Sequence, residues 1–91
     1  MQFVIVKQAD GKYLFEVPEG FRVTVGENVV VATCRGERTG VALCDSFFVG
    51  DEETQTMLMN AWGTKKDRMK PVLGVVSFSY FKEDSDIDRK G

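Results

Sequence analysis

Residues 26–44 read GENVVVATCRGERTGVALC, and this stretch contains the pattern that decides the fold. Three consecutive valines, Val29–Val31, favour a β-strand because β-branched side chains pack well on a pleated surface. The turn residues Arg35-Gly36 follow, and a further strand region is predicted from Arg38 to Phe48. Gly40 lies early in that region, where a glycine indicates a bulge or the close approach of another backbone. The stretch therefore predicts two strands joined by a tight hairpin.

Strand patterns also precede this hairpin. The continuous apolar run Phe3–Val6 predicts a strand that is covered on both faces. Asp10-Gly11 is a strong hairpin signal and leads into a second strand over residues 12–17. We expect the inner face of that strand to carry Tyr13, Phe15 and Val17. A break at Pro18-Glu19-Gly20 then separates it from a short third strand over Phe21–Val25.

One helix is predicted, over residues 51–62. Asp51 is a good N-cap, and Glu52 and Glu53 suit the positive end of the helix dipole. Gly63 is placed to end the helix. The apolar side chains that share one helical face are Met57, Leu58, Ala61 and Trp62. We expect this stripe to anchor the helix on the sheet.

A last strand is predicted over residues 72–81, opened by Pro71 and carrying Val76, Phe78 and Tyr80 on one face. Residues 82–91 are charged and lack apolar periodicity, so we expect a disordered tail. Five or six short strands with tight turns and one short helix predict a mainly β (α+β) fold. The expected architecture is a small bent antiparallel sheet or barrel, in a single domain over residues 1–81.

The composition is that of a folded globular domain. The chain has 91 residues, of which 43% are apolar and 29% charged, and its net charge is −2. This length accommodates one domain. No uninterrupted apolar run exceeds four residues, which excludes a transmembrane helix and a secretory signal peptide. We therefore expect a cytoplasmic protein without a membrane partner.

The residue types leave little reactive chemistry. Histidine, the commonest general base and metal ligand, is absent. Cys34 and Cys44 lie in strand patterns, so we expect reduced thiols that pack as small hydrophobes. A structural zinc needs four closely spaced ligands, and a catalytic thiol needs a nearby base, whereas only Asp45 is close to Cys44. We expect neither a metal nor a cofactor, and no enzyme activity.

Basic residues gather in two loops of this acidic chain. The loop 64–70 has a local charge of +3, from four basic residues and Asp67, and the turn 35–38 adds two arginines. If the two loops meet in space, they form a patch that could hold phosphates. Alternatively, the lysines only make an exposed loop soluble. Aromatic side chains such as Tyr13 could stack on bases, although strand aromatics usually belong to the core. The candidate contacts with a protein or a nucleic acid are Arg35, Arg38, Lys65, Lys66, Arg68 and Lys70.

Three stretches carry a family resemblance. They are Tyr13-Leu14-Phe15 with Pro18; Gly26–Val31 with Thr33, Arg35-Gly36 and Gly40-Val41; and Lys70-Pro71-Val72-Leu73. In this order they resemble a bacterial domain named after a yeast polymerase-suppressor protein. The middle stretch also resembles the N-terminal DNA-binding domain of the primosomal helicase, which shares a small-barrel design. Glu27 and Gly74 depart from the family pattern, which has aspartate and arginine at these places.

The resemblance implies a small barrel that acts as a non-catalytic partner, because family members are linked to RNA-processing complexes. The leading hypothesis is therefore a non-enzymatic binding or adaptor module whose partner is a protein, or RNA or DNA bound weakly. An accessory protein of a phage or mobile element that inhibits a host factor is an alternative. A small enzyme that uses the carboxylates of Asp45 and Asp51 is the least supported, because no base, nucleophile or metal set accompanies them. The sequence does not decide the oligomeric state.

Overall fold

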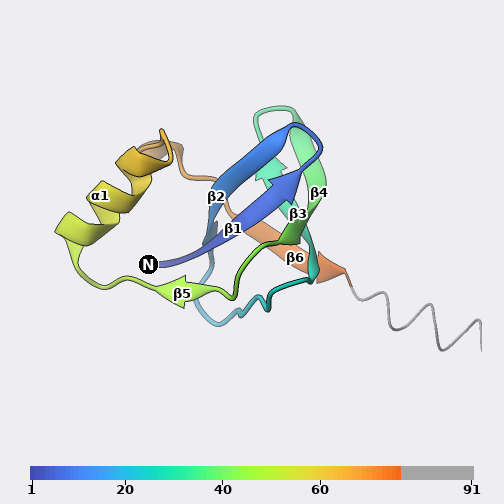
Figure 1. The fold of residues 1–91 in the computed structure, drawn as a ribbon, viewed down its shortest axis with the longest axis horizontal. Helices are drawn as coiled ribbons and strands as arrows, with labels where there is room; N and C mark the ends of the chain where they lie inside the picture. The colour runs from blue at the N-terminus through green and yellow to red at the C-terminus, as the bar shows by residue number, and fades with distance from the viewer. Residues whose placement is uncertain (77–91) are drawn as a thin grey trace, which may run out of the picture.

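The computed structural model describes residues 1–76, which form a curled, mostly antiparallel sheet with one helix beside it (Figure 1). The strands are β1 (Gln2–Gln8), β2 (Gly11–Val17), β3 (Asn28–Thr33), β4 (Gly36–Ala42), β5 (Phe47–Phe48) and β6 (Val72–Val76). The helix α1 spans Glu52–Ala61, and a 3₁₀ turn, η1, spans Lys66–Arg68. The strand order is β2-β1-β4-β3-β6, and β5 pairs with β1. The predicted mainly β class with one short helix is confirmed.

Both predicted hairpins are present. The first joins β1 to β2 through Ala9-Asp10, with Gly11 as the first residue of β2, and the second joins β3 to β4. Gly36 has a φ of +97°, which a residue with a side chain rarely adopts. The hydroxyl of Thr33 donates to the carbonyl of Gly36 at 2.7 Å and accepts from the N–H of Arg35 at 3.1 Å. These bonds hold the β3–β4 turn, and with it Arg35, in one conformation.

Gly40 lies where β4 passes closest to β1. A methyl group built on its Cα would be 2.5 Å from Cγ1 of Val6 and 2.7 Å from the carbonyl oxygen of Lys7. Only a residue without a side chain allows this approach. The prediction that Gly40 marks a close backbone approach is therefore confirmed, and the partner is β1.

The third strand predicted over Phe21–Val25 is wrong. The segment has no ladder partner, because side chains satisfy its backbone. The N–H of Val23 donates to Oγ of Ser46 at 3.0 Å, and the N–H of Val25 donates to Oδ1 of Asp45 at 2.8 Å. Val23 is buried, whereas Phe21 and Val25 are exposed.

The strand predicted over Arg38–Phe48 is also wrong in its length. β4 ends at Ala42, the chain bends, and β5 pairs with the start of β1 instead. The bend lies at Leu43 and Cys44, directly before Asp45 and Ser46, whose side chains hold the neighbouring segment. Two short strands therefore replace one long one.

Two apolar clusters hold the fold. The larger lies inside the curled sheet and consists of Val4, Val6, Phe15, Val17, Val23, Val29, Val31, Ala42 and Val72. The smaller lies between the β1–β2 hairpin and α1 and consists of Phe3, Leu14 and Met59. Phe15 and Val17 face inward as predicted, but Tyr13 does not, because it stands at the open end of the sheet and is 40% exposed.

Helix α1 begins and ends as its sequence predicts. Oδ2 of Asp51 accepts from the backbone N–H and the hydroxyl of Thr54, both at 2.8 Å. Gly63 has a φ of +70°, and the N–H of Thr64 donates to the carbonyl of Met59 at 2.9 Å. This arrangement satisfies the last carbonyls of the helix.

The helix presents a different face to the sheet from the one predicted. Gln55 and Met59 are buried, and Leu58 and Trp62 are half-buried. The amide of Gln55 donates to the carbonyl of Val49 at 2.7 Å, so its burial leaves the donor satisfied. Met57 is 65% exposed, and Ala61 is exposed as well. Of the predicted stripe, Leu58 and Trp62 therefore pack on the sheet side, whereas Met57 and Ala61 do not.

The Asp51 cap leads to a pH-dependent prediction. Hydrogen bonds from the backbone and then the side chain of Thr54 hold the pKa of Asp51 below its ordinary 3.8. Such a carboxylate stabilises the fold above its ordinary pKa, and the contribution is lost as the pH falls through the folded-state pKa. We expect Asp51→Asn to lower the melting temperature by roughly 2–5 °C at neutral pH. The difference should shrink as the pH falls from about 5 to about 2, through the ordinary and then the folded-state pKa.

Circular dichroism at a series of pH values measures this difference. Asp67→Asn is the matched control, because it removes an aspartate charge in η1, away from the N-terminus of α1. If Asp51→Asn lowers the melting temperature by the same amount at neutral and at acid pH, the charge of Asp51 does not stabilise the helix as described.

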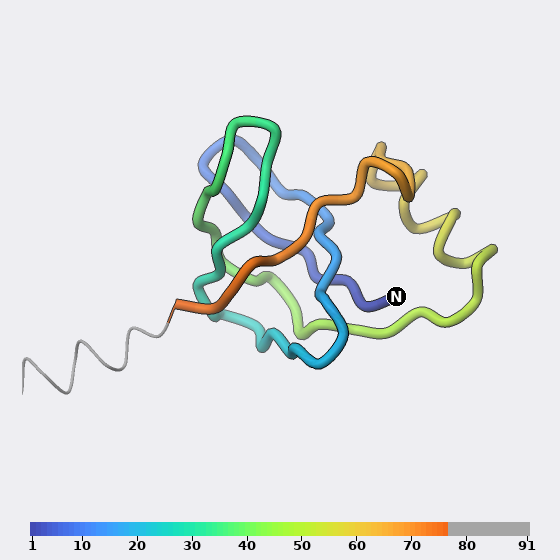
Figure 2. The backbone as a smooth tube through the Cα atoms, turned by 180° about the vertical axis from the view of Figure 1, so that it is seen from behind, coloured from blue at the N-terminus to red at the C-terminus, as the bar shows by residue number. Residues whose placement is uncertain are grey.

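The chain after α1 is held between β2 and β3. The N–H of Glu16 in β2 donates to the carbonyl of Lys70 at 2.9 Å, and the N–H of Ala32 in β3 donates to the carbonyl of Pro71 at 3.0 Å. Figure 2 shows this segment crossing from the helix towards β6. Its side chains therefore have a defined place beside β2.

β6 is the last element described. It pairs with β3 and ends at Val76, so residues 77–81 of the predicted strand lie outside the described residues. The same holds for Phe78 and Tyr80, for the tail predicted over 82–91, and for the end of the domain predicted over 1–81.

Candidate functional site

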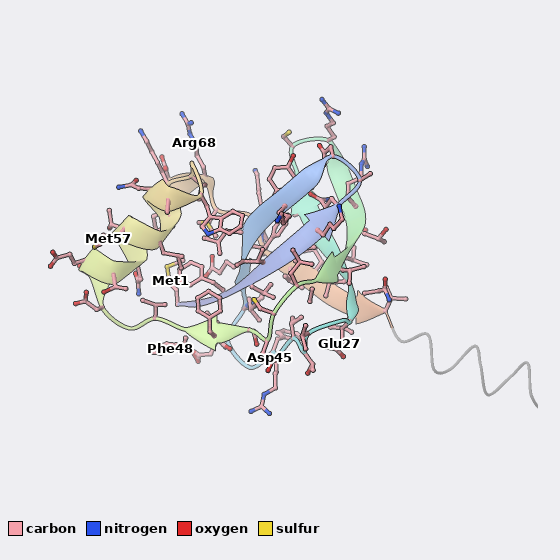
Figure 3. The ribbon with its side chains drawn as sticks, viewed as in Figure 1. Met1, Glu27, Asp45, Phe48, Met57 and Arg68 are labelled. Carbon is pink, nitrogen blue, oxygen red and sulfur yellow. The ribbon has the colours of Figure 1, made fainter. Side chains whose placement is uncertain are left out.

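A groove of about 780 Å³ opens between the β3–β4 turn, β2 and the segment after α1. In Figure 1 the turn and the segment lie on opposite sides of β2. Figure 3 places Arg68 near the C-terminal end of α1. We call this hollow the cationic groove, because its basic lining residues are Arg35, Arg38, Arg68 and Lys70.

Four of the six basic residues singled out in the sequence line this groove. The two loops that carry them therefore line one hollow, from opposite sides, and a ligand in that hollow could contact both. Lys65 and Lys66 are not among the lining residues and stand exposed at the start of η1. The structure thus divides the predicted cluster into groove residues and surface residues.

Two aromatic side chains that line the groove are predicted from the sequence to lie elsewhere. Tyr13 was expected in the core and Trp62 on the sheet as an anchor, but both line the groove. Trp62 is half-buried and packs against the cluster under the helix, so it combines anchoring with a groove position. The feature of the sequence that could have indicated a groove position for Trp62 is its place beside Gly63, where the helix ends and the chain turns towards β2.

Tyr13 stands between opposite charges. Its hydroxyl lies 3.5 Å from the carbonyl oxygen of Asp10, to which it donates. The pKa of Tyr13 is raised, first by desolvation and then by the hydrogen bond and charge of Asp10, while Arg35 acts in the opposite direction. The phenol is therefore neutral at physiological pH and offers an uncharged aromatic ring.

The groove concentrates positive charge on an acidic chain. Asp10 is the one acidic residue among its lining residues, against four basic ones, which leaves a formal charge of +3. The whole chain has a net charge of −2. Charge of one sign lining a concave surface attracts ligands of the opposite sign.

The two thiols lie in different environments. Cys44 packs against the larger core as predicted, but Cys34 is exposed in the β3–β4 turn, where it lines the groove. The prediction of a packed Cys34 is wrong, because the strand ends one residue earlier, at Thr33. Among residues 1–76, no three His, Cys, Asp or Glu side chains are grouped closely enough to hold a metal ion.

The carboxylates of the enzyme alternative have structural partners. Asp45 accepts from the backbone of Val25, and Asp51 accepts from that of Thr54. Neither lines the cationic groove. Their positions are explained by the loop and the helix cap that they hold.

Comparison of the chain with protein-family models, with curated proteins and with solved structures found no match. The resemblance to the polymerase-suppressor domain and to the primosomal helicase domain therefore stays a prediction. Within the described part of the chain, the helices are too short or too polar to cross a membrane.

Proposed function

We propose that this chain is a non-enzymatic binding module that holds single-stranded nucleic acid in the cationic groove. The observation that carries the proposal is the meeting of four basic side chains with Tyr13 and Trp62 around one hollow. Basic side chains release counterions from phosphates, and aromatic rings stack on exposed bases. Both groups of contacts are needed to hold a single strand, and both are present in the same place.

Single strands suit the groove better than a duplex does. The bases of a duplex are paired and stacked on one another, so their faces are not free to contact Tyr13 or Trp62. The faces of unpaired bases are accessible, and stacking on them does not depend on sequence. We therefore expect RNA and DNA strands to bind in preference to duplexes.

A second candidate partner is a protein. Phe48 is 72% exposed and Phe21 is 59% exposed. Val23 and Ser46 hydrogen-bond to each other, and each phenylalanine lies two residues from that contact, so the two neighbouring segments both present an aromatic side chain. Exposed aromatic side chains are typical of protein-binding surfaces. An adaptor would use this surface for a partner that the groove does not hold.

Fluorescence anisotropy with labelled single-stranded RNA and DNA tests the proposal. We expect the full chain to bind at about 50 mM salt and several-fold more weakly at about 200 mM. Arg35→Gln with Arg68→Gln should weaken binding about tenfold, because each removes a phosphate contact.

Lys65→Gln with Lys66→Gln is the matched control, because it removes the same charge from the same region outside the groove. The proposal fails if neither strand binds at the lower salt, or if the two double variants weaken binding equally. In the first case, Phe48→Ser becomes the variant to test against protein partners, and it must release a partner without unfolding the chain.

A further inference from the structure

The basic residues of the groove stand on two separate walls. Arg35 belongs to the β3–β4 turn and Arg38 to the first half of β4, and we call the two residues the turn wall. Arg68 and Lys70 belong to the segment after α1, and we call them the loop wall. In Figure 1, β2 lies between the β3–β4 turn and the segment after α1, and Tyr13 of β2 lines the groove together with both walls.

Hydrogen bonds to the backbone hold each wall in place. The turn wall is held by the bonds of Thr33 across the hairpin. The loop wall is held by the bond from Glu16 to Lys70 and, within η1, by the bond from the N–H of Arg68 to the carbonyl of Lys65 at 2.9 Å. Two positively charged walls that are held in place favour a ligand that presents an anionic group to each of them.

We propose that the cationic groove clamps one nucleotide unit of a single strand by the phosphates on its two sides, one phosphate on each wall, with the base against Trp62. This inference rests on the proposed function and adds the chemical unit that is recognised, a nucleoside 3′,5′-bisphosphate. The volume of about 780 Å³ is in the usual range of small-molecule sites, so it suits a short unit. Tyr13, neutral between the walls, offers a second aromatic contact.

The clamp predicts how steeply the affinity falls with salt concentration. Each neutralised phosphate of a single strand contributes about −0.7 to the slope of log affinity against log salt. Two phosphates give a slope of about −1.4, which is about a sevenfold loss between about 50 and 200 mM salt. A long basic strip that follows the strand would contact more phosphates and give a steeper slope.

The fluorescence of Trp62, the one tryptophan of the chain, reports on binding without a label. The full chain is titrated with thymidine 5′-monophosphate, thymidine 3′,5′-bisphosphate and oligothymidylates of increasing length. We expect the bisphosphate to quench Trp62 and to bind about tenfold more tightly than the monophosphate, because it reaches both walls. The affinity for longer strands should rise only because they offer more positions at which the groove can bind.

Variants of each wall complete the test. Arg35→Gln with Arg38→Gln, or Arg68→Gln with Lys70→Gln, should reduce bisphosphate binding to the level of the monophosphate and change the salt slope by about 0.7. Lys65→Gln with Lys66→Gln should leave both values unchanged. All four wall residues are exposed, so the variants are expected to fold, which circular dichroism checks.

The outcomes separate the clamp from the proposed function. If strands bind but the bisphosphate binds no better than the monophosphate, the clamp is wrong and the function stands. The same conclusion follows if affinity keeps rising with strand length and the slope is steeper than about −2. If no strand binds at about 50 mM salt, both are overturned.

Discussion

Gly40→Ala is expected to destabilise the fold by about 3 kcal/mol, the upper end of the usual range for an overpacked site. The added methyl group would meet the carbonyl oxygen of Lys7 at 2.7 Å and the side chain of Val6 at 2.5 Å. The side chain of Val6 has no room to turn away, because it is fully buried. The backbone of β1 would therefore have to move away from β4, which would weaken the sheet at its centre.

Gly74→Ala is the matched control for this substitution. Gly74 also lies within a strand, but a methyl group there would have no neighbour within 4 Å. Because alanine restricts the unfolded chain more than glycine does, this variant is expected to be neutral or slightly stabilising. Urea unfolding followed by the fluorescence of Trp62 measures both free energies. Equal midpoints for the two variants would show that β4 does not approach β1 as described.

Phe3→Ala is expected to destabilise the fold by about 3–5 kcal/mol. Phe3 is fully buried, and its ring centroid lies 6.0 Å from that of Phe47. It belongs to the small cluster with Leu14 and Met59, which holds α1 on the β1–β2 hairpin. A loss of this size approaches the whole stability of a small domain, about 5 kcal/mol at the low end.

The same substitution should also weaken nucleic-acid binding. Trp62 packs against this cluster, and the loop wall follows it in the chain, so a helix that leaves the sheet takes part of the groove with it. Phe48→Ala removes an equal ring from a position that is 72% exposed, and it should change stability by no more than about 0.5 kcal/mol. Unfolding and anisotropy measurements on both variants test the account. Similar losses for the two would contradict the role of the cluster under α1.

The sequence by itself determined the local features of this protein. The turns at Asp10-Gly11 and Gly36, the N-cap at Asp51 and the helix end at Gly63 were all predicted correctly. Each depends on the backbone preferences of one residue or on hydrogen bonds that span a few residues. The mainly β class followed from these turns together with the β-branched runs between them. Gly40 could be recognised as a point of close approach, although its partner could not.

Only the tertiary structure decided which distant segments meet. Phe21–Val25 has a strand pattern, yet the side chains of Asp45 and Ser46, about twenty residues away, satisfy its backbone and leave it irregular. Tyr13 has the alternation of a core residue, but the sheet ends beside it and leaves it in the groove.

The site itself depends on the same distant contacts. The turn wall and the loop wall are about thirty residues apart in the chain, and they line one groove because β3 pairs with β6 and the carbonyl of Lys70 accepts from β2. Charges in a sequence carry no information about such pairings, because strand order is set by the burial of apolar faces that all the strands share. The basic residues could therefore be named from the sequence, but their division into groove residues and the exposed Lys65 and Lys66 required the fold.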